Sequence, residues 1–262
     1  TINDGTVNIW TEQVALRYGL TLTTRAAGGN SYATGNARIV ATPDAVGNAA
    51  TPTLQAQIDS FLAAGGPAAG DMVLLSAGTA DMVAEITKVG LGQQTAAQAR
   101  ANLEQAAKDL SSQVRRLVQA GAKHVVVTGP YNLGRSPWAV ATNQVAALQD
   151  YSTAFSNALL VAMVDLGSNV PYVDLPLQFN QLTGFPSSFA LTNINAAACT
   201  SVDAGPGIGL GTGQVNSALC NTSTLASGVT PDTWLFADAI YPTPVGHRNF
   251  GDYAYTRITL RW

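Results

Sequence analysis

Hydrophobic and polar positions alternate along this chain in two distinct patterns. Short apolar runs that end near Gly or Pro predict buried strands of a parallel sheet at 71–76, 124–129 and 170–174. Apolar residues at helical spacing predict amphipathic helices over 8–18, 53–64, 95–120 and 143–166. Because strands and helices alternate, we expect an α/β fold with helices on both faces of the sheet. In such a fold a ligand site lies beyond the carboxyl ends of the strands.

The periodic pattern lapses from 178 to 233, where turn-forming residues dominate. Cys199 and Cys220, the only cysteines, bracket a loop-like stretch that cannot form its own core. A disulfide there would remove loop entropy worth about 3 kcal/mol, so we favour a disulfide in an oxidising compartment over two free thiols. We therefore expect a single domain over 1–262, with 178–233 as a loop-rich surface excursion.

Composition narrows the possible functions further. The 262 residues are 47% hydrophobic and 11% charged, with a formal net charge of −3, so the chain can bury a substantial core. No basic stripe indicates a nucleic-acid partner, and no apolar run reaches the roughly 20 residues of a transmembrane segment. The Gly-rich stretch 203–213 follows no strand and holds no Lys, so no cofactor-binding motif is indicated, nor is a metal site. The polar start fits a cytosolic or a processed chain, and few Lys together with the Cys pair favour export from a bacterium, as a secreted, extracellular or outer-membrane surface protein.

The candidate chemistry lies near the C-terminus, in the run Leu235-Phe-Ala-Asp238-Ala-Ile-Tyr241-Pro-Thr243. This run resembles the Leu-Phe-x-Asp-x-x-His-Pro-Thr block of the GDSL (SGNH) hydrolases, secreted and autotransporter members included. In that family the Asp orients the His, and the His takes the proton of a serine nucleophile. Tyr241 occupies the His position, and a phenol with an ordinary pKa near 10 keeps its proton at neutral pH. We expect Asp238 to be a vestigial triad member that caps the turn and accepts a hydrogen bond from the Tyr241 hydroxyl.

Three further segments resemble the family in the family's order. The run 28–39 is similar to the second block, in which Gly35 matches the glycine whose backbone amide serves the oxyanion hole. The run 73–81 is similar to the third block, but Ala80 stands where the family has an Asn donor; loss of such a donor costs about 100- to 1,000-fold in turnover. The loop 129–137 resembles the one after the family's fourth strand. The resemblance implies a cleft near Gly35, Gly78, Asn132 and Asp238.

The family's first block is missing, because no Gly-Asp-Ser-Leu occurs in the sequence. The resemblance implies a flavodoxin-like, three-layer fold with a parallel central sheet, and the absent block would be its first, central strand. Such a gap exposes unpaired backbone groups and has to be filled. We expect a retained N-terminal fragment, further residues, or a strand lent by a neighbouring subunit to fill it.

Other residues that could replace the nucleophile or the base are expected to have structural roles. We expect His247 to be a solvated or capping residue and His124 to pack at the far end of its strand. Ser31 and Ser76 lack a nearby base, and Asp81 is expected to cap a helix or to be an acid of its first turn.

The leading hypothesis is therefore an exported, catalytically inactive GDSL-like protein with a structural, assembly or binding role. The alternative is a carboxylic ester hydrolase whose serine lies on an N-terminal segment outside these residues. A third hypothesis is a module that binds an ester or carbohydrate ligand in the old cleft without turnover.

Overall fold

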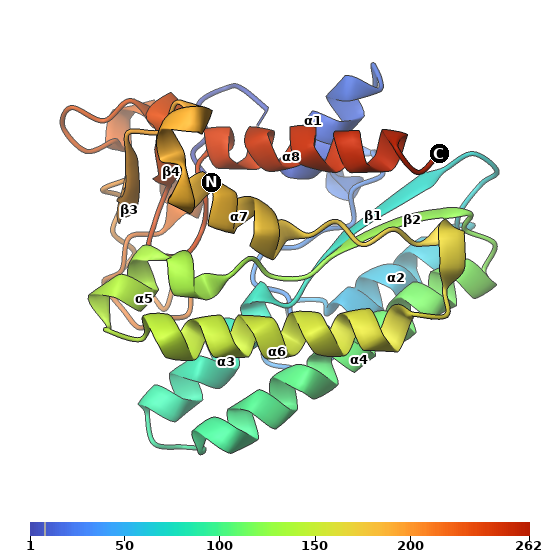
Figure 1. Cartoon of the computed structure of the whole chain (residues 1–262), viewed down its shortest axis with the longest axis horizontal. Helices are drawn as coiled ribbons and strands as arrows, with labels where there is room; N and C mark the ends of the chain where they lie inside the picture. The colour runs from blue at the N-terminus through green and yellow to red at the C-terminus, as the bar shows by residue number, and fades with distance from the viewer. Residues whose placement is uncertain (8) are drawn as a thin grey trace.

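Two pairs of parallel strands and the helices around them make up the fold (Figure 1). The computed structural model describes residues 1–7 and 9–262. The strands are β1 (Met72–Ser76), β2 (His124–Thr128), β3 (Asn193–Ala197) and β4 (Trp234–Phe236). The helices are α1 (Trp10–Arg17), α2 (Leu54–Ala63), α3 (Thr79–Gly90), α4 (Ala96–Gln119), α5 (Pro137–Ala141), α6 (Val145–Met163), α7 (Leu175–Gly184) and α8 (Pro244–Thr259). Figure 1 shows α1 and α8 on one side of β1 and β2, and α2, α4 and α6 on the other. The α/β class is thus confirmed.

The strands β1 and β2 pair in parallel register from Met72 opposite His124 to Ser76 opposite Thr128. The third predicted strand, 170–174, is wrong as a full strand, because only Tyr172 forms a bridge, to Val127. Pro171 has no amide to donate, and the residue after Val173 already caps a helix, so pairing is limited to two hydrogen bonds with Val127.

The predicted helices form among the described residues, with ends set by local capping chemistry. Residue 8, where the first helix was predicted to begin, lies outside the described residues. Thr95 and Gln98 form a capping box at the start of α4, and the apolar stripe of that helix is fully buried at Leu103, Leu110, Val114 and Leu117. The helix predicted over 143–166 is shorter, because Asn143 has a left-handed φ of 53° and the helical turns begin only after Gln144.

The excursion predicted over 178–233 is only partly irregular. Its first residues belong to α7, where Asp174 caps the helix by accepting from the Leu177 amide at 2.9 Å. Phe179 and Leu182 of α7 are buried in the core, and further on β3 pairs with β4 in parallel. The apolar spacing of α7 is short and interrupted by polar residues, so it gave no clear helical pattern in the sequence.

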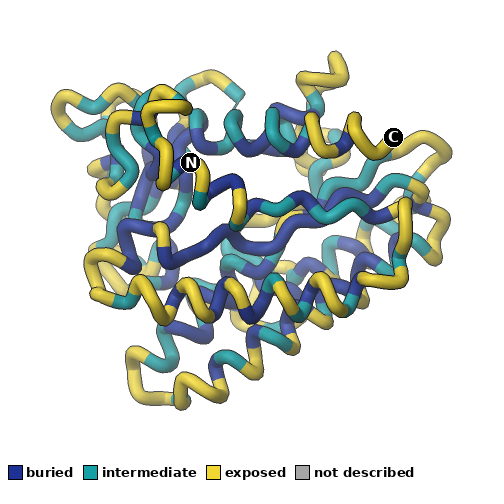
Figure 2. The backbone as a smooth tube through the Cα atoms, in the orientation of Figure 1, coloured by how far each residue is buried: buried dark blue, intermediate teal, exposed yellow. Residues whose placement is uncertain are grey.

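The predicted disulfide between Cys199 and Cys220 is present. It lies in a small apolar cluster separate from the main core, made of Ile2, Ala198, the two cysteines and Ala237. The residues buried in the main core lie along β2 and the inner faces of the helices (Figure 2). Within 1–7 and 9–262, no helix has both the length and the apolar character needed to cross a bilayer.

Candidate functional site

Asp238 is fully buried just after β4, and its carboxylate is held by backbone amides. One oxygen, Oδ1, accepts from the amides of Ile240 at 2.8 Å and Tyr241 at 2.7 Å. The other, Oδ2, accepts from the Ser217 amide at 3.0 Å. Asp238 therefore caps the turn 238–241. The predicted bond from the Tyr241 hydroxyl is wrong, since the donor from Tyr241 is its backbone amide.

The phenol of Tyr241 lies in surroundings that keep it protonated. Burial raises its pKa above the ordinary value of 10, and the carboxylates of Asp238 and Asp44 raise it further. A group of this kind cannot take a proton from a nucleophile at neutral pH. The side chain of Tyr241 is therefore not a proton acceptor at neutral pH.

The turn 238–241 is supported from the loop that follows β2. The Tyr131 hydroxyl donates to the Ile240 carbonyl at 2.5 Å, and the Trp138 amide donates to the Ala239 carbonyl at 2.9 Å. The Tyr131 ring also stacks on Phe179 of α7 at 4.4 Å between centroids. The sequence placed Tyr131 in a family-like loop but gave it no role, because nothing in the pattern shows that its hydroxyl reaches a turn more than 100 residues away.

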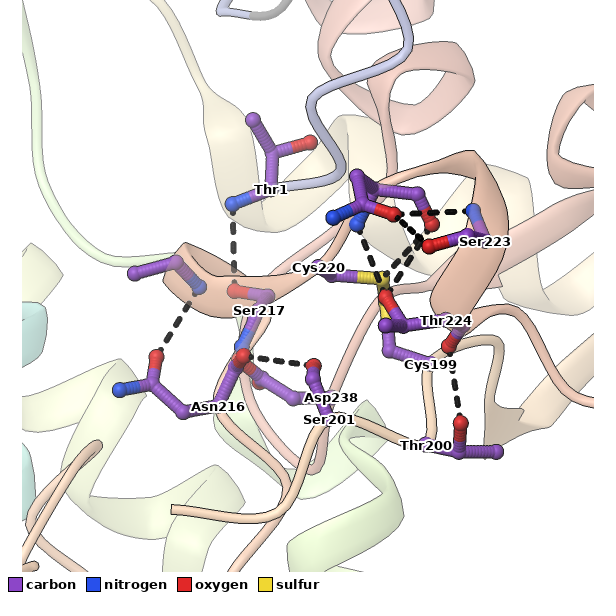
Figure 3. The surroundings of a disulfide bond; sticks show 12 residues. Thr1, Cys199, Thr200, Ser201, Asn216, Ser217, Cys220, Ser223, Thr224 and Asp238 are labelled. Atoms are coloured by element: carbon purple, nitrogen blue, oxygen red, sulfur yellow. Dashed lines mark hydrogen bonds between the residues drawn. A yellow bond between two sulfur atoms is a disulfide. The ribbon is translucent and has the colours of Figure 1, made fainter.

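The disulfide region forms a second support for the same turn (Figure 3). Cys199 donates its amide to the Ala237 carbonyl at 3.1 Å, on one side of Asp238. Ser217, whose amide binds Asp238, lies in the short turn that ends at Cys220. The Ser217 hydroxyl in turn lies 3.1 Å from the backbone nitrogen of Thr1. The loop-rich segment is thus part of the site and not a peripheral feature.

The positions matched to the oxyanion hole lie on α3 and on an exposed turn. Gly78 precedes α3 with a φ of 110°, and a Cβ there would lie 2.6 Å from the Phe155 ring, so glycine is required. Ala80 is buried in the first turn of α3 and has no side-chain donor. Gly35 is exposed in a turn before Asn36, which has a left-handed φ of 61°.

A hydrogen bond joins the turn at Gly35 to the segment that holds Asp44. The carbonyl of Asn36 accepts from the Ala45 amide at 3.1 Å, and the neighbouring Asp44 is one of the carboxylates that raise the pKa of Tyr241. The segment around Gly35 is thus tied by this hydrogen bond to the one that holds Asp44, whose charge acts on Tyr241.

A buried ionic network joins the second and third family-like segments. Arg38 lies 3.2 Å from Asp81 and 2.7 Å from Glu85, and all three side chains are almost completely buried. Asp81 also accepts from the Ile39 amide at 3.1 Å. As predicted, Asp81 is an acid in the first turn of α3.

The two acids of this network differ in pKa. Burial raises the pKa of Asp81 to about 6, against the opposing effect of Arg38. Burial would also raise the pKa of Glu85, but hydrogen bonds from Lys88, Asn102 and Gln94 outweigh it and hold this pKa at about 2. At neutral pH the positive charge of Arg38 therefore offsets the cost of keeping the buried Asp81 carboxylate charged.

Asn132, expected to line the cleft, uses its side chain elsewhere. Its Nδ2 donates to Asn180 at 2.9 Å, and its Oδ1 accepts from the Gly134 amide at 3.1 Å. It lines a small pocket of about 200 Å³ that also includes Tyr172 and Asp174. The side-chain amide of Asn132 therefore has its hydrogen-bond partners in α7 and in the loop after β2.

The two histidines lie in different surroundings. His247 is half-buried in the first turn of α8, where Thr243 is the cap, so of the two roles expected for His247 the capping role is wrong. Burial lowers its pKa to about 3, and such an imidazole is neutral but binds a proton too weakly to act as a base near pH 7. His124 packs edge-on against Trp262 at 4.5 Å, at the start of β2, in agreement with the packing role expected for it.

Comparison with known proteins gives a family and a distant relative. Residues 2–254 match the family of GDSL-like lipases and acylhydrolases. A Pseudomonas putida protein, described as an uncharacterized protein in the trpE-trpG intergenic region, is 27% identical over 157 residues. The match covers 58% of this chain and 24% of that relative, so the chain spans about a quarter of its length.

Proposed function

Since the chain belongs to the GDSL-like lipase/acylhydrolase family, we propose that residues 1–262 form a family domain that does not hydrolyse esters and acts in binding or assembly. The observation that supports the proposal most strongly is the use of the Asp238 carboxylate within the turn 238–241. Its carboxylate is held by three backbone amides, and the side chain at the position of the base is a protonated phenol. Asp238 here stabilises a turn and has no imidazole to orient.

The other parts that acyl transfer requires are also missing from the described residues. Ala80 cannot stabilise an oxyanion with its side chain. His247, with a pKa of about 3, is too weak a base to replace an imidazole of ordinary pKa. A site that lacks its base keeps only a small part of the rate enhancement that a complete triad provides.

The same proposal places the protein outside the bacterial cytoplasm, as a secreted or cell-surface protein. Support comes from the disulfide, since such bonds persist in oxidising compartments. It also comes from the few Lys and Arg residues, 13 in 262.

Labelling with a fluorophosphonate serine probe and turnover of a short-chain nitrophenyl ester test the proposal on the purified chain. We expect no labelled serine and no rate above that of the unfolded protein. Tyr241→Phe is the matched variant; it removes the hydroxyl and should leave both results unchanged. A stoichiometric label mapped to one serine of this chain would refute the proposal.

The alternative function is hydrolysis of a carboxylic ester with a serine from outside these residues. It is favoured by the hydrogen bond that joins the turn at Gly35 to the segment at Asp44, a carboxylate whose charge acts on Tyr241. Run on the longer polypeptide that carries this serine, the same ester assay should show turnover that falls when Asp238 is changed to Asn.

A further inference from the structure

The pocket of about 200 Å³ that Asn132 lines lies between α6 and the chain that leads into α7. Figure 1 shows the chain turning back after α6 and running beside it into α7. The described lining includes no residue of the turn 238–241, so this pocket is separate from the site at Asp238. At about 30 Å³ per water molecule, its volume equals roughly seven waters, which is the size of a single sugar ring.

The helix α6 presents a polar face to the pocket. Five polar residues of this helix contribute to the lining: Gln149, Ser152, Thr153, Ser156 and Asn157. Because they recur three or four residues apart, they share one side of the helix. The apolar stripe of α6 is buried in the core, so the polar side chains are free to define what the pocket binds.

Two hydroxyl groups of the pocket have hydrogen-bonding capacity that the described residues do not use. The side-chain oxygens of Ser156 and Tyr172 are buried and have no hydrogen-bond partner in the part of the chain that the structure describes. Burial raises the pKa of Tyr172 to about 12; the nearby Ser156 hydroxyl opposes the shift but lies outside hydrogen-bonding geometry. The phenol is therefore protonated at neutral pH and can donate. Because a buried hydroxyl without a partner is costly, a ligand that bonds these groups is favoured.

The opposite wall provides a donor and an acceptor on fixed side chains. Oδ1 of Asn180 accepts from Asn132 at 2.9 Å and from Arg135 at 3.1 Å, which orients the amide and leaves its Nδ2 as a donor. Asp174 caps α7 through Oδ1, which accepts from the Leu177 amide at 2.9 Å and leaves Oδ2 as an acceptor. Both groups are held in place by the protein before any ligand binds.

The charge and polarity of the lining restrict the ligand. Asp174 is the only charged residue in the described lining, so anions are disfavoured. A small cation would pair with Asp174 but would leave the donors of Tyr172 and Asn180 unused. A ring that carries several hydroxyls fits both kinds of group, because each hydroxyl donates and accepts. Leu160 and Pro176 add apolar surface for the C–H groups of such a ring.

We propose that the pocket between α6 and α7 binds a single uncharged pyranose sugar. Its hydroxyls accept from Tyr172 and from Nδ2 of Asn180, and they donate to Oδ2 of Asp174. The buried hydroxyls of Ser156 and Tyr172 reach the sugar through side-chain rotation. This binding is independent of whether the site at Asp238 is catalytic.

A chemical-shift titration of the isotope-labelled whole chain tests the proposal, with D-glucose, D-galactose and D-mannose as probes. We expect saturable binding of at least one of them, with amide shifts confined to 149–157 and 172–180. Thr153→Trp places a large ring at the exposed side of the pocket and should weaken binding at least tenfold. The matched control is Val161→Trp on the same helix, at a residue that is 74% exposed and outside the described lining; it should bind like the unchanged chain.

A second variant keeps the proposal testable if Thr153→Trp does not fold. Asp174→Asn retains a side-chain oxygen that can cap α7 but removes the charged acceptor, so it should also weaken sugar binding at least tenfold. The proposal is overturned if none of the three sugars binds saturably, or if the shifts lie outside the two segments. It is also overturned if choline binds where no sugar does, since the pocket is then a cation site.

Discussion

Replacing Arg38 with Met removes the side chain that bridges the buried carboxylates of Asp81 and Glu85. Glu85 keeps its ion pair with Lys88, whereas Asp81 loses its cation. Arg38 lies 3.2 Å from Asp81 and 2.7 Å from Glu85, and its side chain is only 9% exposed. Because the change leaves buried charge without its partner, we expect a loss of about 3–5 kcal/mol in the free energy of unfolding. Urea denaturation followed by circular dichroism measures it.

The pH dependence of this loss identifies its cause. The folded state holds the pKa of Asp81 at about 6, above the ordinary 3.8, and without Arg38 this pKa rises further. Acidification from pH 8 to pH 5 protonates Asp81 in the folded variant, so the gap between variant and unchanged chain should narrow. Glu85 does not contribute to this pH dependence between pH 8 and pH 5. Its pKa is lowered from the ordinary 4.5 to about 2, so its protonation changes the stability only as the pH falls below 4.5.

A matched control distinguishes the loss of a buried arginine from the loss of an exposed one. Arg100 pairs with Glu104 and Asp150 on the surface, so Arg100→Met should shift the urea midpoint little. Equal shifts for the two Arg→Met variants, or a gap at Arg38 that does not change with pH, would show that the buried network does not stabilise the fold as argued.

Two further changes test other parts of the fold. Changing both Cys199 and Cys220 to Ala opens a loop of 21 residues in sequence separation and should lower the free energy of unfolding by about 3 kcal/mol; an unchanged urea midpoint would contradict this. Gly78→Ala places a methyl group 2.6 Å from the Phe155 ring at a φ of 110° and should cost roughly 2–4 kcal/mol in the same assay. Gly90→Ala, where a Cβ meets no atom within 4 Å, is its control and should be neutral or slightly stabilising.

The sequence predicted those elements whose signals are local. The α4 helix has a capping box at Thr95 and a long apolar stripe, and its predicted bounds agree with the structure within a residue at each end. The β2 strand is a run of β-branched residues that ends before Gly129. The segment 170–174 failed as a strand because pairing depends on the amide that Pro171 lacks, and α7 was missed because its apolar spacing is short.

Prediction of the candidate site was limited by contacts between distant segments. The Asp238–Tyr241 block was visible in the sequence because the residues that carry it are adjacent. The bond from Tyr131 to Ile240 joins residues 109 apart, and the bond from Ser217 to Asp238 joins residues 21 apart. No local pattern shows which of several donors will reach a buried carboxylate. The sequence therefore predicted the cap at Asp238 together with a bond from the Tyr241 hydroxyl, and only the cap is present, formed by backbone amides.

The position of the cysteine pair links maturation of the chain to the shape of its site. Cys199 binds the backbone just before Asp238, and Cys220 ends the turn whose Ser217 amide reaches the carboxylate. Oxidation of the two thiols therefore clamps Asp238 from both directions. A reduced chain would lose the covalent link between these two supports and would hold them together by hydrogen bonds alone, so oxidation during folding should make this end of the domain more rigid.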